Sequence, residues 1–192
     1  MSLPEIEAAL CEFCEAIIHE LLYQRQIYSP DLFQRHRLYD VVVRRSRHQK
    51  LNDYIHGVVQ SIREALMQGL IEKIAVLVLD SSGCVVERFT MQLKVQSEIL
   101  QSVDVEDIES ALRGCLLKLQ YANASLGPCK EGCTFEVVAY TATKSSMPKD
   151  TWVDGEPQSP VSSNGGDLPS LVPIKSAQVG SGAFRVQLYA EH

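Results

Sequence analysis

The stretch EKIAVLVLDSSGCVVERFTMQL, residues 72–93, predicts the centre of the fold. Residues 74–79 form an unbroken apolar run rich in branched side chains, which is typical of a strand buried on both faces. Residues 80–83 favour a chain reversal, because Asp and Ser bond to the local backbone and Gly tolerates positive φ. Over residues 85–95 polar side chains such as Glu87 alternate with apolar ones, which indicates a strand with one solvated face. The pattern predicts an antiparallel hairpin.

Three amphipathic helices are predicted from apolar residues at helical spacing. Their apolar stripes run over residues 6–21, 51–66 and 108–119. The first helix starts at a capping box, residues 2–5, and its length indicates a central packing role. Gly69 favours a left-handed cap after the second helix. Ser102 and the acidic residues 104–109 favour the start of the third helix, because negative charge suits the positive end of a helix dipole. A turn-rich loop is expected over residues 123–132.

The C-terminal third of the chain changes character after a predicted strand at residues 134–140. Residues 144–182 are rich in Pro, Gly and Ser, a composition typical of a linker or a disordered loop. Against that interpretation, the segment contains an isolated Trp152 and an apolar cluster at residues 168–174, and a strand pattern follows at residues 184–189. We interpret it as a long mobile excursion that returns to pair with the sheet.

The composition of the chain limits its class. It has 192 residues, 45% of them apolar, which suffices for one domain with a sizeable core. Its formal net charge of −6 argues against wholesale binding to polyanions. No apolar run is long enough to cross a bilayer, and the N-terminus lacks the pattern of a signal peptide. We therefore expect a soluble, intracellular protein that does not bind membranes.

Residues 35–50 hold the one concentration of Arg and Lys in the sequence. Clustered guanidinium groups suit a phosphate-facing surface or a nuclear-import signal. A solvated hairpin, whose charges discourage edge pairing, explains the same pattern. Sequence-specific nucleic-acid binding is not expected, because few aromatic residues are interleaved and the chain is acidic overall.

The six cysteines are scattered through apolar sequence, which predicts free thiols. Cys11 with Cys14, and Cys129 with Cys133, have spacings at which thiolates can share one zinc ion, so a zinc site remains an alternative. The sequence has no phosphate-binding loop, no nucleophile motif and no histidine spacing typical of a metal site. We therefore expect a binding protein without cofactor or metal rather than an enzyme.

Short motifs in the same order carry a resemblance to a known family. They are LCEF at 10–13, LFQR at 32–35, LNDYI at 51–55, EK at 72–73, LD at 79–80, GCTF at 132–135 and QLY at 187–189. The chain resembles the HORMA-domain family over almost its whole length. The resemblance implies one α/β domain of the α+β kind over residues 1–192, in which three helices pack on a central, mainly antiparallel sheet. Residues 1–143 would form the core, and residues 144–192 a mobile safety belt ending in a strand.

Within the family, these residues resemble the non-catalytic accessory subunits of translesion DNA polymerase zeta. The resemblance implies an adaptor in DNA damage tolerance, located in the nucleus, with the cytoplasm as an additional location. Its belt would trap a short, proline-bearing peptide of the catalytic subunit of DNA polymerase zeta, which adds a strand to the sheet. A Y-family scaffold polymerase would be the second partner. A spindle-checkpoint or ubiquitin-ligase-regulating HORMA adaptor is the alternative of the same fold, and a zinc or nucleic-acid binding protein the alternative of another class.

The resemblance also implies roles for individual residues. Tyr54 and Trp152 would line the partner-peptide site, although Trp152 could equally be a hydrophobic anchor for the belt. Leu171, Gln187 and Tyr189 would form the surface for the second partner.

Self-association, as a homodimer or as a heterodimer with another HORMA protein, is a further expectation. It would involve Arg113 and Arg35. Alternatively, Arg113 would simply pair with Glu109, one helical turn away.

Overall fold

The computed structural model describes residues 3–96, 103–129, 131–141, 147, 152–155, 161 and 169–192. The helices of these ranges are α1 (Leu3–Gln24), α2 (Gln49–Met67) and α4 (Val105–Leu126), with short 3₁₀ turns at Pro30–Leu32 and Gly180–Gly182. The strands are β1 (Phe33–Leu38), β2 (Val41–Ser46), β3 (Ile71–Leu79), β4 (Val85–Val95), β5 (Thr134–Thr141), β6 (Leu171–Val179) and β7 (Phe184–Glu191). In the described ranges, the predicted helices and strands are all present.

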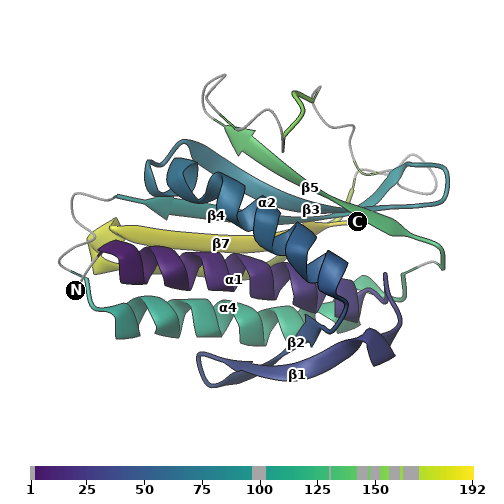
Figure 1. The fold of residues 1–192 in the computed structure, drawn as a ribbon, viewed down its shortest axis with the longest axis horizontal. Helices are drawn as coiled ribbons and strands as arrows, with labels where there is room; N and C mark the ends of the chain where they lie inside the picture. The colour runs from purple at the N-terminus through teal and green to yellow at the C-terminus, as the bar shows by residue number, and fades with distance from the viewer. Residues whose placement is uncertain are drawn as a thin grey trace.

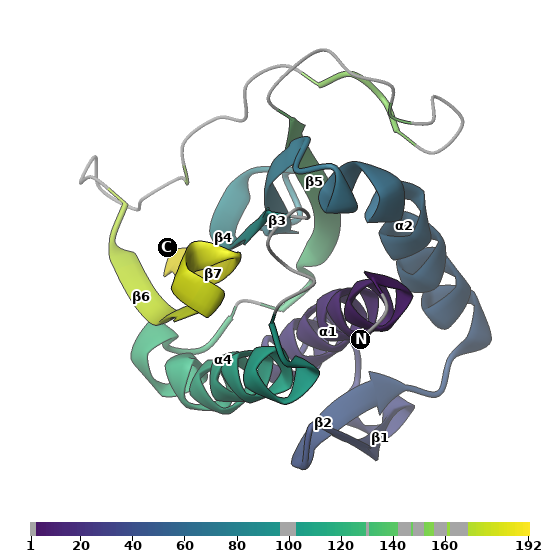
Figure 2. The same ribbon diagram turned by 90° about the vertical axis from the view of Figure 1, so that its left-hand side faces the viewer.

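The described strands form a five-stranded sheet in the order β5-β3-β4-β7-β6 and a separate β1-β2 hairpin. Every neighbouring pair in the large sheet is antiparallel. The three helices lie on one face of this sheet, and α1 runs between α2 and α4 (Figures 1 and 2). The predicted α+β fold, with three helices on a mainly antiparallel sheet, is confirmed.

The predicted hairpin is formed by β3 and β4, with Ile74 opposite Met91. Oδ1 of Asp80 accepts backbone hydrogen bonds from Ser82 at 2.9 Å and from Cys84 at 3.0 Å, which holds the turn. Gly83 has a φ of +82°, a conformation that side chains with a Cβ rarely adopt. All six residues from 74 to 79 are buried, as the apolar run predicts.

Helix α1 is the centre of the core, because more than one of its faces is covered. Its predicted stripe is fully buried: Ile6, Leu10, Phe13, Ile17 and Leu21. Cys14, Ile18 and Leu22, on its other faces, are buried as well. The central packing role predicted from the length of this helix is confirmed.

The alternation of polar and apolar residues predicts that Glu87 lies on the solvated face of β4, and this prediction is wrong. Glu87 is buried against the helices, where its carboxylate accepts hydrogen bonds from the guanidinium of Arg25 at the end of α1. Arg25 also donates to Oδ1 of Asn123 and to the carbonyl of Gly127 beyond α4. A charged residue can face the interior here because its charge is paired and its hydrogen bonds are satisfied.

Two element boundaries differ from the sequence expectation. Helix α4 continues to Leu126, so the loop predicted from residue 123 begins later. Its N-cap is Asp104, whose side chain accepts from the backbone N–H of Glu106. The predicted capping residues Ser2 and Ser102 lie outside the described residues.

Strand β6 was not predicted, although residues 168–174 stood out as apolar. Pro173, Lys175 and Ser176 interrupt the alternation that marks a strand. Pro173 is tolerated because β6 is an edge strand. On the outer side of an edge strand no neighbouring strand needs a backbone N–H as hydrogen-bond donor. The predicted returning strand, β7, is confirmed and lies between β4 and β6.

The cysteines are all free thiols, as predicted. Burial raises the pKa of the Cys11 thiol to about 11 and that of Cys115 to about 12. None of the helices in the described ranges has the length and apolar character that a membrane crossing requires.

Candidate peptide-binding site

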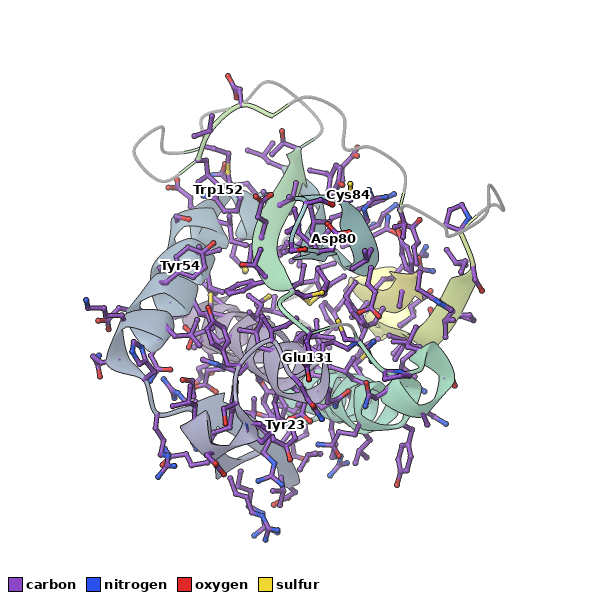
Figure 3. The ribbon with its side chains drawn as sticks, turned by 90° about the vertical axis from the view of Figure 1, so that its right-hand side faces the viewer. Tyr23, Tyr54, Asp80, Cys84, Glu131 and Trp152 are labelled. Carbon is purple, nitrogen blue, oxygen red and sulfur yellow. The ribbon has the colours of Figure 1, made fainter. Side chains whose placement is uncertain are left out.

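Strand β5 is one of the two edge strands of the large sheet. It pairs with β3 on one side, and no described strand pairs with its other side. Such an edge presents backbone N–H and C=O groups that can pair with an added extended peptide. Helix α2 runs beside β5 (Figure 3).

A cavity of about 830 Å³ lies along this edge. It is lined by side chains of β5, β3, β4 and β7, by Tyr54 of α2 and by the C-terminal residues Trp152 and Val153. The structure therefore brings together Tyr54 and Trp152, which are far apart in the sequence. Both lie on the α2 side of β5 (Figure 3).

Tyr54 stands on the exposed side of α2 and is 47% exposed. Its ring meets that of Phe135, at the start of β5, edge to face, with centroids 5.8 Å apart. Tyr28 packs on Phe135 in the same manner, with centroids 6.2 Å apart. Partial burial raises the pKa of the Tyr54 hydroxyl, so Tyr54 presents a neutral aromatic ring and a hydroxyl donor at neutral pH.

A second hollow, of about 490 Å³, is centred on these three aromatic rings. Leu32, Leu51 and residues of the α2 start complete its wall, and Tyr54 lines this hollow and the larger cavity. Aromatic-lined grooves are the typical docking sites of proline-bearing extended peptides. The sequence prediction missed Phe135 and Tyr28. Phe135 could have been singled out, because it is an aromatic residue near the start of the predicted strand at residues 134–140.

Trp152 is attached to α2 by a hydrogen bond. Its indole Nε1 donates to Oγ of Ser61 at 2.7 Å, and the Ser61 hydroxyl donates to the carbonyl of Val58 at 2.6 Å. The ring also packs against the main core, on the helix side of the sheet. Trp152 therefore lines the cavity and attaches its segment to α2, and its predicted role in binding a partner peptide stays a prediction.

Val161 is a second contact of the C-terminal segment, and the sequence analysis did not predict it. Its side chain is buried against Leu77, Leu79 and Val85, on the sheet face away from the helices. Trp152 and Val161 therefore contact the protein on opposite sides of the sheet, on either side of the β5 region.

Leu171, Gln187 and Tyr189 lie on the sheet face away from the helices. Gln187, Tyr189 and Glu191 lie on the same face of β7, because they are two residues apart along the strand. Leu171 of β6 is opposite Glu191 in the register and therefore shares this face. Leu171 is 58% exposed, whereas Tyr189 is half-buried and lines the large cavity. The structure brings these predicted residues onto one surface.

Arg113 and Arg35 are both exposed, on α4 and β1 respectively. Arg113 donates a hydrogen bond of 3.5 Å to Oγ of Ser110. No ion pair joins it to Glu109 within the described residues, so the alternative helix pair is not formed. The side chain of Gln120 on α4 donates to the carbonyl of Val42 on β2, which ties the two elements together.

The zinc alternative gains no support from the geometry. The described ranges contain no group of three or more His, Cys, Asp or Glu side chains that could hold a metal ion. Cys11 and Cys14 are buried on α1, whereas Cys129 and Cys133 contact each other beside Glu87.

An open strand edge, an aromatic-lined cavity and a C-terminal segment attached on both sides of that edge define a class of protein that receives extended peptides, an adaptor. The chain belongs to the HORMA domain family, whose model matches residues 8–151. It is 31% identical to the DNA polymerase zeta processivity subunit of Arabidopsis thaliana, over 98% of this chain and 86% of that protein. It is also 31% identical to the human mitotic spindle assembly checkpoint protein MAD2B, over 95% of this chain and 88% of that protein.

Solved structures share the fold. A chain in the crystal structure of the mitotic checkpoint complex aligns with a TM-score of 0.80 at 20% identity and covers 98% of both chains. HTP-2 of C. elegans, bound to the HIM-3 closure motif, aligns with a TM-score of 0.69 at 14% identity, over 95% of this chain and 87% of that one.

Proposed function

We propose that this protein is the non-catalytic accessory subunit of a translesion DNA polymerase zeta. The observation that carries the proposal is the aromatic-lined cavity along the free edge of β5, in a chain 31% identical to a polymerase zeta processivity subunit. The accessory subunit binds a short, proline-bearing peptide of the polymerase catalytic subunit. It acts in the nucleus and has no catalytic activity of its own.

The peptide adds a strand to β5 and is retained by the belt, residues 144–192. Its backbone pairs with the free edge, and its side chains enter the hollows beside Tyr54 and Trp152. A proline docks against the rings of Tyr54 and Phe135, because its apolar ring needs no donor there. Release of the peptide then requires Trp152 to leave Ser61, which slows dissociation.

A second partner, the Y-family scaffold polymerase, binds the surface of Leu171, Gln187 and Tyr189. This surface is on the belt strands β6 and β7, on the side away from the helices. Arg113 and Arg35 belong to a separate self-association surface over α4 and the β1-β2 hairpin. The distance of that surface from β5 in the fold would allow self-association and peptide binding together (Figure 2).

Peptide capture tests the proposal. A peptide from the catalytic subunit that carries the proline segment is immobilised, and purified wild-type protein is expected to bind it. Tyr54→Ala combined with Trp152→Ala is expected to abolish capture. Tyr121→Ala is the matched control, because Tyr121 is an exposed aromatic residue on α4 that lines neither hollow. Undiminished capture by the double variant would contradict the proposed site.

A checkpoint adaptor is the second candidate, because the human relative is named a mitotic spindle assembly checkpoint protein. Both candidates use the same peptide site and differ in their partners. Identification of the proteins that copurify with a tagged chain from its own cells separates them: polymerase subunits support the first, and checkpoint components without polymerase subunits support the second.

A further inference from the structure

A polar hollow lies on the sheet face away from the helices, beyond the second-partner surface. It has a volume of about 150 Å³ and is lined by Ala177 and by six polar residues from β4, β6 and β7: Gln92, Lys94, Ser176, Gln178, Arg185 and Gln187. In the register, Lys94 is directly opposite Arg185, and Arg185 is opposite Gln178. The next row places Gln187 between Gln92 and Ser176.

Two positive charges face each other across β4 and β7 in this hollow, an arrangement that costs stability. Neither Lys94 nor Arg185 has an ion-pair partner within the described ranges. No acidic side chain lines the hollow there either, although the chain as a whole carries a net charge of −6. An incoming anion would therefore relieve the repulsion between Lys94 and Arg185.

The Arg185 guanidinium occupies space that a side chain on Gly182 would take. Gly182 has a φ of +101°, and a Cβ on this residue would lie 3.0 Å from Nη2 of Arg185. The same Cβ would lie 3.5 Å from Nε2 of Gln178. The glycine thus leaves room for the guanidinium near the amide of Gln178, so nitrogen donors of both side chains lie close to Gly182.

We infer that this hollow binds acidic side chains, Asp or Glu, of a protein partner. Guanidinium, ammonium, amide and hydroxyl donors suit carboxylate oxygens, and the hollow is large enough for one or two such side chains. A protein is the occupant because Gln187 belongs to this hollow and to the second-partner surface. In that respect the inference rests on the proposed function. The same partner would contact Tyr189 and Leu171 with apolar groups and Lys94 and Arg185 with carboxylates.

The test measures binding of a fluorescein-labelled oligoglutamate peptide by anisotropy, with an oligoglutamine peptide of equal length for comparison. Wild-type protein is expected to prefer oligoglutamate, and the preference should shrink as salt is raised, because exposed charges are screened. Lys94→Gln with Arg185→Gln should weaken binding by about tenfold or more. The matched control, Arg37→Gln with Lys118→Gln, removes the same charge from exposed positions outside the hollow and should leave binding unchanged.

Three outcomes would overturn the inference. They are equal binding of oligoglutamine, an equal loss of binding in the control pair, and tighter binding of an oligothymidylate at the same residues, which would indicate nucleic acid instead. Amide chemical shifts report where wild-type protein binds oligoglutamate, so the conclusion does not depend on the folding of a variant. Shifts are expected at residues 92–94, 176–178 and 185–187, and shifts confined to other regions would contradict the assignment.

Separate measurements test the acidic-partner hollow and the proposed function, so either can be disproved while the other holds. The Lys94 and Arg185 variant should still capture the proline-bearing peptide, because neither residue lines the cavity along β5. If the wild-type protein binds oligoglutamate but does not capture the proline-bearing peptide, the polymerase assignment is overturned and the inference on the polar hollow stands.

Discussion

The indole of Trp152 donates a hydrogen bond of 2.7 Å to Oγ of Ser61, and this bond joins the C-terminal segment to helix α2. The two residues are 91 positions apart in the sequence. The bond closes one side of the space in which a peptide would lie along β5. Loss of this hydrogen bond should therefore raise the dissociation rate of a bound peptide.

Trp152→Phe should raise the dissociation rate of the bound peptide, because the ring remains but the donor is lost. Ser61→Ala removes the acceptor and should have a similar effect, each by about two- to tenfold. The double variant should dissociate no faster than either single variant, since one bond is removed in all three. Biolayer interferometry measures the rates, and strictly additive effects would show that the two side chains act independently.

Tyr54→Ala should weaken peptide binding by about 2 kcal/mol or more, because an aromatic anchor in a hollow supplies a large share of interface energy. Tyr54→Phe should retain most of the affinity, since its ring still packs edge to face on Phe135. Calorimetric titration gives both affinities. Neither change should lower the melting temperature appreciably, because Tyr54 is 47% exposed. Equal losses in Tyr54→Ala and Tyr54→Phe would assign the effect to the hydroxyl instead.

Removal of one partner of the buried Arg25–Glu87 pair should destabilise the protein strongly. Arg25→Ala or Glu87→Ala leaves an uncompensated charge in the core and should lower the free energy of unfolding by about 3 to 5 kcal/mol. Arg25→Met combined with Glu87→Met removes both charges and should cost less than either single change. Urea denaturation measures the values. Single variants that lose less than about 1 kcal/mol would show that water reaches the remaining charge.

His19 should make stability depend on pH. Its side chain is 2% exposed, and burial together with the nearby charge of Arg45 lowers its pKa from 6.5 to about 4. The unfolded chain therefore takes up a proton more readily than the folded protein between these two values. The stabilisation is complete above pH 6.5 and is lost as the pH falls towards 4, by about 3 kcal/mol for this residue.

Urea denaturation of wild-type protein and of His19→Leu, at several pH values between 6.5 and 4, measures this contribution. The leucine variant cannot bind the proton, so its free energy of unfolding should fall less steeply over that interval. Parallel curves for the two proteins would show that His19 titrates normally in the folded state.

Periodic patterns predicted the elements of this fold well where one face of an element is uniformly apolar. The apolar stripe of α1, the apolar run of β3 and the alternation of β7 each predict which residues are buried, because these patterns depend only on residues close together in the sequence. The position of Glu87 could not be predicted in this way. A carboxylate faces the core only because Arg25 arrives from another element, and local periodicity carries no information on such a partner.

The sequence by itself determined the helices, the central hairpin and the free thiols. Through its resemblance it also singled out Tyr54 and Trp152, which line one cavity in the structure. Only the tertiary structure decided that β6 forms an edge strand, that Phe135 and Tyr28 complete the aromatic hollow, and that Val161 is buried on the opposite face. It also placed Lys94 opposite Arg185. The physical reason is the range of the interactions: helix and strand periodicity depends on neighbours in the chain, whereas strand order, register and shared cavities depend on contacts between distant segments.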